Sequence, residues 1–458
     1  MSDYKSTFLH TLEERGYIKQ ATHTAELDTY CSSGVPVAYI GFDATADSLH
    51  VGSLVGIMML RRLQQAGGKP VVLMGGGTTK VGDPTDKEKS RPILTEDQIA
   101  SNIAGIKKAF EPFLTFGDGP TDAIMVNNDD WLSKIGYIEF LRDIGKYFTI
   151  NTMVKQDTVA RRLTNEQPYT FLEFNYLLLQ SYDFLELSRR HGCFLQMGGS
   201  DQWGNIVGGT DLIHKADGNQ GYGLTCPLIT TASGGKMGKT ADGAVWLNAE
   251  KRSPYEYWQF WRNTEDADVG RFLKLFTDLP MDDIAKLAAL EGADINQAKI
   301  ALANAATTML HGDQAAKEAE AAASKAFTGG GVSADLPTFD IAKTDFADGP
   351  TTTALLRAGE LVASNGEARR KMNEGAVRVN DEKIAADQAH AWDDILDDVQ
   401  AFKVQVGKKT HRAGQAGLAF PIASGCWRQD LFIRKIREFL RWRFQIRIDR
   451  DRLRDCRI

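Results

Sequence analysis

The chain has 458 residues, which is too long for one compact core, so two or three domains are expected. Hydrophobic residues make up 43% and charged residues 25%, as in ordinary globular proteins, and the longest apolar runs are far too short for a membrane span. A formal net charge of −6 argues against uniform coating of nucleic acid, but it leaves room for a local basic face that binds RNA.

Cysteine usage predicts a cytoplasmic protein. The five cysteines are scattered and odd in number, and they lack the spacing of metal ligands. The N-terminus lacks the basic-then-apolar order of a secretory signal. We therefore expect reduced thiols and no dedicated metal site.

The first part of the chain predicts a βαβ unit. Residues 1–36 have helical periodicity, Val37–Phe42 is a buried strand, and Lys69–Met74 is a second strand that runs into three glycines. Between the strands lies a helix that opens near Ser53. Ligands of such units bind at the carboxyl ends of the strands. The helix N-terminus suits an anion there, and Gly52 would let a phosphate or a flat ligand lie against the backbone.

Two later segments contain candidate pocket residues. Residues 78–91 form a polar loop dense in lysine and arginine. On the helix expected over residues 171–184, Tyr176, Gln180 and Asp183 are spaced i, i+4 and i+7 and share one face. They interrupt an apolar stretch, so we expect them to face inward, where they need polar partners.

The remaining elements follow in order. Residues 194–203 contain a short strand, two glycines and an acidic helix start, and residues 234–240 form a glycine-flanked loop with two lysines but without P-loop spacing. The segment 250–325 has a helical composition. Residues 328–350 read as a linker, and residues 351–406 as a small α/β module.

Two strings resemble the signatures of class I aminoacyl-tRNA synthetases, in the form carried by the tyrosyl-tRNA synthetase family. Tyr39-Ile-Gly-Phe-Asp43, followed by Thr45 and Asp47-Ser-Leu-His50, is similar to the HIGH region. Lys236-Met-Gly-Lys-Thr240 is similar to the KMSKS loop. One departure is Ser53, which stands where the signature has its second histidine. Serine can donate a hydrogen bond but cannot carry positive charge.

The resemblance covers roughly residues 1–409 and implies a set of site residues. For catalysis it implies Thr45, His50, Lys87, Arg91, Lys236, Lys239 and Thr240. For tyrosine it implies Tyr39 and Asp183 at the phenol hydroxyl, Asp83, Tyr176 and Gln180 around the ammonium group, and Gln202. For ATP it implies Asp43, Gly52, Ser53, Gly199, Asp201 and Lys239. As bare sequence, the same residues would pass for helix caps, tight turns and surface charge.

The resemblance also implies an architecture of the α/β class. A Rossmann-like parallel-sheet catalytic domain is expected over residues 1–248, and a helical domain that contacts tRNA over residues 249–327. After a linker, 328–350, a small α+β RNA-binding module of the αL type is expected over residues 351–409. Its basic face would consist of Arg369, Arg370, Lys371 and Arg378. The expected partners are L-tyrosine, ATP with Mg²⁺, tRNA(Tyr) and a second copy in a homodimer, but neither DNA nor a membrane.

Residues 410–458 depart from the family pattern. The family has a final strand and then ends, whereas here the stretch 410–417 and about forty further residues follow, with 11 Lys or Arg against 5 Asp or Glu over 427–458. One interpretation is a basic RNA-binding tail. Our hypothesis is a frameshift, because a one-base shift in a possible coding sequence for 412–417 gives the strand-like Gly-Leu-Val-Lys-Leu. An intact mass that includes all 458 residues, measured on native protein, would refute a sequencing error.

Two alternatives remain open at this point. One is the related synthetase for tryptophan, although Tyr39 and Asp183 suit a phenol better than an indole. The other is an inactive RNA-binding protein descended from a synthetase, which the replacement at Ser53 leaves open. Amino-acid-dependent exchange between ATP and pyrophosphate would separate the three.

Overall fold

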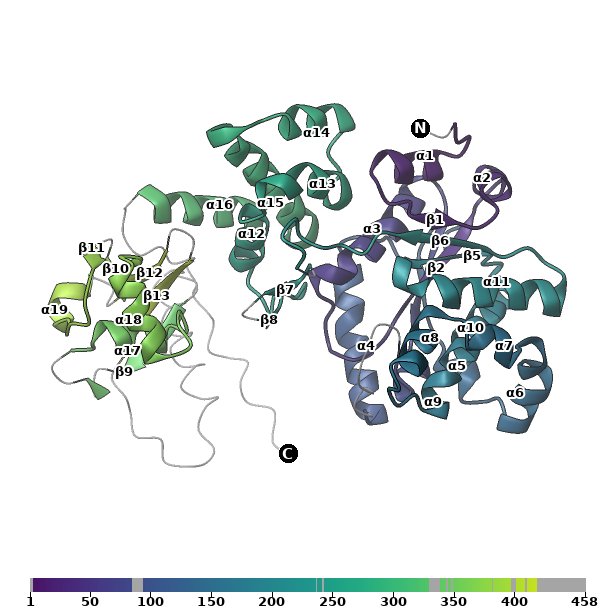
Figure 1. Cartoon of the computed structure of the whole chain (residues 1–458). Coiled ribbons are helices and arrows are strands. Elements are labelled where there is room, and N and C mark those ends of the chain that lie inside the picture. The colour runs from purple at the N-terminus through teal and green to yellow at the C-terminus, as the bar shows by residue number, and fades with distance from the viewer. Residues whose placement is uncertain are drawn as a thin grey trace, which may run out of the picture.

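The computed structural model describes residues 3–84, 94–235, 237–240, 243–328, 338–342, 345–346, 349–380, 382–396, 401–407 and 410–417. Figure 1 shows an α/β domain, a group of helices and a small module with strands, following one another along the chain. No helix within these ranges is both long and apolar enough to cross a membrane.

The first domain is built on a six-stranded sheet in the order β1–β6–β5–β2–β3–β4. The strands are β1 (Gln20–Ala21), β2 (Val37–Phe42), β3 (Lys69–Met74), β4 (Ile124–Asn127), β5 (Leu195–Gly199) and β6 (Tyr222–Cys226). All neighbours are parallel except β1, which runs antiparallel to β6. The predicted βαβ unit is confirmed, because β2 and β3 pair in parallel and α3 (Val51–Gln65) connects them.

Helices surround this sheet (Figure 1). Besides α3 they are α1 (Thr7–Glu14), α2 (Thr24–Ser32), α4 (Glu96–Phe110), α5 (Asp129–Leu132), α6 (Tyr137–Asp143), α7 (Ile150–Met153), α8 (Asp157–Thr164), α9 (Phe171–Phe174), α10 (Tyr176–His191) and α11 (Trp203–Asp217). Helices α3 and α10 are each followed by a glycine in the left-handed conformation. Gly67, with φ of +85°, follows α3, and Gly192, with φ of +61°, follows α10. Glycine adopts these left-handed conformations without steric cost.

Alternate residues of β2 face two different cores. Ile40 and Phe42 belong to the hydrophobic cluster that contains Ile57 of α3. Tyr39 belongs to the other cluster, with Phe184 of α10. Because successive side chains of a strand point to opposite faces, the strand places Tyr39 on the α10 side of the sheet.

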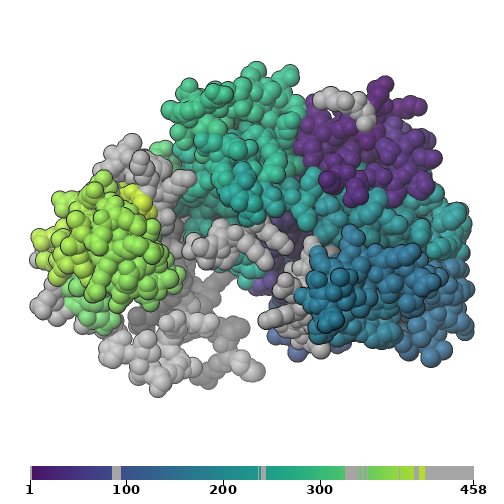
Figure 2. Space-filling model, in the orientation of Figure 1, coloured from purple at the N-terminus to yellow at the C-terminus, as the bar shows by residue number. Residues whose placement is uncertain are grey.

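The second part is helical, as the composition of this segment predicts. Its helices are α12 (Pro254–Arg262), α13 (Asp266–Phe276), α14 (Met281–Ala288), α15 (Ile295–His311) and α16 (Asp313–Thr328). Trp258 and Trp261 of α12 lie in the same hydrophobic cluster as Ile57 of α3. The helical domain therefore shares a core with the sheet domain, and Figure 2 shows the two as one continuous body.

The C-terminal module has a five-stranded sheet in the order β11–β10–β12–β13–β9. Its elements are β9 (Thr338–Ala342), α17 (Thr352–Ala358), α18 (Asn365–Asn373), β10 (Val377–Val379), β11 (Glu382–Ile384), α19 (Trp392–Ile395), β12 (Ala401–Val406) and β13 (Thr410–Gly417). Phe402, Val404 and Leu356 are among its fully buried residues.

Two boundaries differ from the sequence expectation. The expected linker, 328–350, contains β9, and the expected tail, 410–458, begins with β13. Strand β13 pairs antiparallel with β12 and parallel with β9. Its glycines and alanines have low strand propensity, so backbone pairing on both sides decides its conformation. The module therefore extends from 338 to at least 417, and residues 418–458 lie outside the described residues.

Candidate active site

A cavity of about 460 Å³ lies at the carboxyl ends of β2 and β5, where the strand order reverses. This is the position at which open α/β sheets bind ligands. Most of the expected site residues line it: Tyr39, Asp43, Thr45, His50, Ser53, Asp83, Tyr176, Gln180, Asp183, Gly199 and Gln202. The three residues predicted to share a helix face do so on α10.

At one end of the cavity, Tyr39 and Asp183 are almost fully buried, with exposed fractions of 1% and 2%. The carboxylate of Asp183 accepts hydrogen bonds from Asn128 Nδ2 at 2.8 Å and from Trp131 Nε1 at 2.7 Å. Burial raises the pKa of Asp183 to about 7, although both hydrogen bonds favour the ionised form. The Tyr39 hydroxyl has no hydrogen-bond partner among the described residues. This end of the cavity therefore suits a ligand hydroxyl that both donates and accepts.

Asn128 joins this end of the cavity to the glycine loop after β3. It is fully buried, its Oδ1 accepts from the Gly77 amide at 2.7 Å, and its Nδ2 also lies 3.0 Å from Thr78 Oγ1. Sequence reasoning missed Asn128 and Trp131. The signal was present, because a polar run, 127–130, begins at the carboxyl end of β4, where ligand-binding residues gather in such sheets.

A chain of amide side chains forms another part of the wall. Gln202 Nε2 donates to Asp83 Oδ2 at 3.1 Å, and Gln180 Nε2 donates to Gln202 Oε1 at 3.3 Å. Asn205, which sequence reasoning also missed, donates to Gln180 Oε1 at 3.0 Å and to Gln202 Oε1 at 3.1 Å. These bonds fix which way each amide points. Gln202 Oε1 already accepts two of these bonds, whereas the Asp83 carboxylate and Gln180 Oε1 can each accept a further bond from a donor group.

The first signature forms the start of α3. His50 is the N-cap residue, and its Nδ1 accepts from the Gly52 amide at 3.0 Å. In the neutral ring the proton is then on Nε2, so His50 can act as a donor. The amides of Val51, Gly52 and Ser53 already donate to Val245 O, His50 Nδ1 and His50 O, so the helix dipole rather than free amides favours an anion at this end.

The KMSKS-like loop lies directly against this helix start. Val51 N donates to Val245 O at 2.8 Å, and Val245 N donates to Gly238 O at 3.0 Å. Gly238 has φ of +82°, and a Cβ on it would come within 2.7 Å of the Gly52 amide nitrogen. Glycine is therefore required at 238 for the two signatures to approach this closely.

Gly52 lies between the His50 ring and the KMSKS-like loop. A Cβ on Gly52 would meet His50 Cε1 at 2.6 Å and the Met237 carbonyl at 3.1 Å. Gly52 does not line the cavity, because the space beside its Cα is filled by the neighbouring ring and loop. The small residue thus serves the contact between the two signatures, and the expectation that ATP lies against Gly52 stays a prediction.

The other expected residues lie elsewhere. Asp201 lines a second cavity, of about 590 Å³, together with residues of α8, α9 and α11. Lys239 and Thr240 form the short strand β7 (Lys239–Thr240), which pairs with β8 (Gly243–Ala244). Lys87, Arg91 and Lys236 lie outside the described residues.

The four expected RNA-binding residues lie in the C-terminal module. Arg369, Arg370 and Lys371 are on α18, and Arg378 is on β10. Arg369, Arg370 and Arg378 are exposed. Lys371 lies 3.3 Å from Glu374, the C-cap residue of α18, so part of the positive charge of this helix is neutralised at its end.

Known proteins share the sequence of this chain over most of its length. Residues 33–328 match the family model described as tRNA synthetases class I (W and Y). A protein of Caulobacter vibrioides named Tyrosine--tRNA ligase is 62% identical over 409 residues, which are 89% of this chain and 97% of that protein. A protein of the same name from Zymomonas mobilis is 56% identical over 417 residues, which are 91% of this chain and 100% of that protein.

The fold is shared as well. The crystal structure of a C-terminally truncated Aspergillus nidulans mitochondrial tyrosyl-tRNA synthetase superimposes with a TM-score of 0.63 and 31% identity, covering 69% of this chain and 93% of that chain. An Archaeoglobus fulgidus structure at 18% identity and a TM-score of 0.51 has a similar fold. The α/β fold class and the family resemblance inferred from the sequence are thereby confirmed.

Proposed function

The chain belongs to the tyrosyl-tRNA synthetases of class I, and from this premise we propose that it is a tyrosine–tRNA ligase of bacterial type. In the first step L-tyrosine and ATP give tyrosyl-adenylate and pyrophosphate. In the second step the tyrosyl group passes to a hydroxyl of the terminal ribose of tRNA(Tyr), and AMP is released.

We assign the selectivity for tyrosine to the buried pair Tyr39 and Asp183. A phenol hydroxyl can donate to the Asp183 carboxylate and accept from the Tyr39 hydroxyl, which has no partner among the described residues. The indole N–H of tryptophan can only donate, and phenylalanine can do neither. Either would leave a buried polar group unpaired, at a cost of about 1–3 kcal/mol.

The amide chain supports a site for the amino group of tyrosine. An ammonium has three donors and no acceptor, so it matches Asp83, Gln180 and the Tyr176 hydroxyl, which line the same cavity. The hydrogen bonds of Gln202 to Asp83 and of Asn205 to Gln180 hold these acceptors in place. We assign Gln202 to the same end of the substrate.

The first chemical step needs no general base, because the tyrosine carboxylate is already a nucleophile. One of its oxygens attacks the α-phosphorus, and the bond to the bridging oxygen breaks as pyrophosphate leaves. Negative charge then grows on the α-phosphate and on the leaving group. Donors aimed at that charge lower the barrier more than they strengthen substrate binding.

We assign this stabilisation to Thr45, to His50 through Nε2–H, and to the Ser53 hydroxyl together with the dipole of α3. Asp43 and Gly199 also line the cavity, and we assign both to ATP. By family resemblance, Lys87, Arg91, Lys236, Lys239 and Thr240 contact the pyrophosphate, and Asp201 contacts the nucleotide. Mg²⁺ would enter with ATP, whose phosphates offer the oxygen ligands that this ion prefers.

The tRNA contacts are assigned to the two C-terminal parts. The helical domain shares a hydrophobic core with the sheet domain, so a tRNA bound there would lie on a part that packs directly against the active-site domain. The exposed arginines 369, 370 and 378 support phosphate contacts by the C-terminal module. We place the protein in the cytoplasm, where buried free thiols such as Cys193 and Cys226 stay reduced.

Exposed apolar side chains support a homodimer. Helices α6 to α9 lie on one side of the sheet domain (Figure 1). In and around them the large exposed hydrophobic residues are Tyr137, Ile138, Leu141, Ile150, Leu163, Phe171 and Leu172. Ile138 is 75% exposed and Phe171 is 67% exposed. Apolar groups gathered in this way are typical of an interface, and light scattering of wild type and Ile138→Glu would test it.

Amino-acid-dependent exchange of pyrophosphate into ATP tests the proposed activity. The purified full chain should catalyse exchange with tyrosine, and neither with tryptophan nor without an amino acid. A transcript of tRNA(Tyr) should then accept tyrosine. Exchange driven by tryptophan would assign the chain to the sister enzyme, and no exchange with any amino acid would refute an active ligase.

A further inference from the structure

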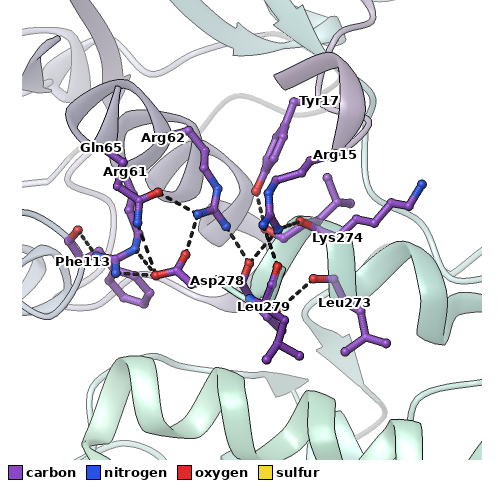
Figure 3. A network of polar contacts seen from close by, with 12 residues as sticks. Arg15, Tyr17, Arg61, Arg62, Gln65, Phe113, Leu273, Lys274, Asp278 and Leu279 are labelled. Atoms are coloured by element: carbon purple, nitrogen blue, oxygen red, sulfur yellow. Dashed lines mark hydrogen bonds and ion pairs between the residues drawn. The ribbon is translucent and has the colours of Figure 1, made fainter. Parts of the chain in front are cut away.

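Helix α3 reaches from the active site to the helical domain. At its start, His50 caps the helix beside the cavity. Near its end, Arg61 and Arg62 point into the turn between α13 and α14 (Figure 3). The rise from His50 to Arg62 is about 18 Å at 1.5 Å per residue.

Asp278 in this turn binds both arginines. Arg61 Nε and Arg62 Nη1 donate to its carboxylate at 3.0 and 2.5 Å, and Gln65 Nε2 lies 3.3 Å away. Burial raises the pKa of Asp278, but the hydrogen bond from Arg61 and the two positive charges outweigh burial and hold it below its usual value. The carboxylate is therefore ionised, and the guanidinium of Arg62, only 4% exposed, is paired with it.

The same cluster satisfies the C-terminal end of α13. Arg15 Nη1 donates to the carbonyls of Lys274 and Thr277 at 3.0 and 2.9 Å, and Arg62 Nη2 donates to Thr277 O at 2.6 Å. The Tyr17 hydroxyl donates to the Leu275 carbonyl. The last carbonyls of a helix lack partners within it, and positive charge is favourable at that end. The contact between α3 and the end of α13 therefore depends on the directions of these hydrogen bonds as well as on charge.

We propose that Asp278 and Arg62 are positioning residues for the first step of the reaction, which hold α3 at the angle that brings its N-terminus to the ATP phosphates. The inference rests on the proposed function. A tilt of about 5° over roughly 18 Å displaces the N-terminus by about 1.5 Å. Misplacement of about 1 Å can cost as much as a hundredfold in rate.

The tyrosine pocket gives the proposal a selective signature. Its walls include residues of β2 and α10 and Asn128, and none of these makes a hydrogen bond to Asp278. Loosening α3 at its far end should therefore slow adenylate formation without weakening tyrosine binding. A general loss of structure would change both.

The test compares Asp278→Asn and Arg62→Lys with a matched control, Asp217→Asn. The control breaks the two-bond contact between Arg189 and Asp217, which lies within the sheet domain at 2.7 and 2.8 Å. Tyrosine-dependent ATP–pyrophosphate exchange is measured for each full-length protein together with its melting temperature. We expect kcat to fall at least tenfold for Asp278→Asn with KM for tyrosine within twofold, and no change in either constant for Asp217→Asn.

Further variants keep the result interpretable. Asp278→Glu retains the charge and should recover most of kcat. If Asp278→Asn does not fold, the same exchange assay is applied to Arg62→Lys. Lysine keeps the positive charge but cannot bind Asp278 and the Thr277 carbonyl at once, as the forked guanidinium does. A lowered melting temperature with unchanged kcat, or a rise in KM for tyrosine in step with the fall in kcat, would overturn the proposal. Absence of exchange by the wild type would refute the proposed function and this inference with it.

Discussion

Replacing Asp183 with asparagine changes the charge at the buried end of the cavity and keeps the side-chain size. In the wild type, Asn128 Nδ2 and Trp131 Nε1 each donate to a different carboxylate oxygen. Asparagine has one oxygen and one NH₂ group. Its NH₂ must therefore face Asn128, Trp131 or the substrate hydroxyl, and one buried donor loses its acceptor.

The size of the effect follows from the hydrogen bonds lost. A bond to a charged acceptor contributes about 1.5–3 kcal/mol, and an unpaired buried donor costs about 1–3 kcal/mol. If the loss of binding free energy for tyrosine is about 2 kcal/mol, the variant should bind tyrosine roughly 30-fold more weakly than the wild type. Phenylalanine makes neither bond, so the preference for tyrosine over phenylalanine should fall by a similar factor.

Exchange kinetics with tyrosine and with phenylalanine provide the measurement. The ratio of the two kcat/KM values is compared for wild type, Asp183→Asn and the control Asp217→Asn. KM for ATP should stay the same, because Asp183 lies at the tyrosine end of the site. A folded Asp183→Asn protein whose preference changes by less than threefold would refute the assignment of Asp183 to the phenol hydroxyl.

His50→Ala should reduce kcat for exchange by roughly a hundredfold and leave tyrosine affinity nearly unchanged, because the phosphate charge that His50 stabilises develops in the transition state. Tyrosine affinity is measured by calorimetry, and equal losses in kcat and in affinity would count against this role. Gly238→Ala should slow exchange about tenfold, because the methyl group would lie 2.7 Å from the Gly52 amide at φ of +82°; a rate equal to wild type would show that the contact is dispensable. Burial raises the pKa of Asp183 from its usual 3.8 to about 7 in the folded protein. The folded state therefore binds more protons than the unfolded state between these values, and stability falls as pH rises from about 4 to 7. Melting curves of ligand-free protein should show this decline for wild type and lack it for Asp183→Asn, and identical pH profiles would refute the shifted pKa.

The parts of the fold that follow from local pattern could be predicted. Strands β2 and β3 are short apolar runs that end in polar or glycine-rich turns, and the helix between them has its own cap and apolar face. The grouping of Tyr176, Gln180 and Asp183 followed from helical spacing alone, since α10 is a single uninterrupted helix. The family motifs then supplied the roles.

Contacts between distant segments could not be predicted in the same way. Asn128 meets Asp183 across 55 residues of sequence, and no periodicity links the two. Strand β13 owes its conformation to partners on both sides, one of them β9, rather than to its own residues. The neighbours of Gly52 could not be predicted either, because a missing Cβ signals a close neighbour without saying whether that neighbour is a ligand or the chain itself.

Asn128 also limits how the amino-acid specificity can be redesigned. A variant that accepts an O-alkylated tyrosine has to lose the Asp183 carboxylate, which removes an acceptor from Asn128 while the Asn128 oxygen still holds the Gly77 amide. Thr78 Oγ1 still accepts from this NH₂ group, but the N–H that faced Asp183 is left without an acceptor, which penalises such variants. Libraries that randomise only the side chains touching the substrate will therefore omit the compensating position, and including Asn128 and Trp131 should raise the yield of folded, selective variants.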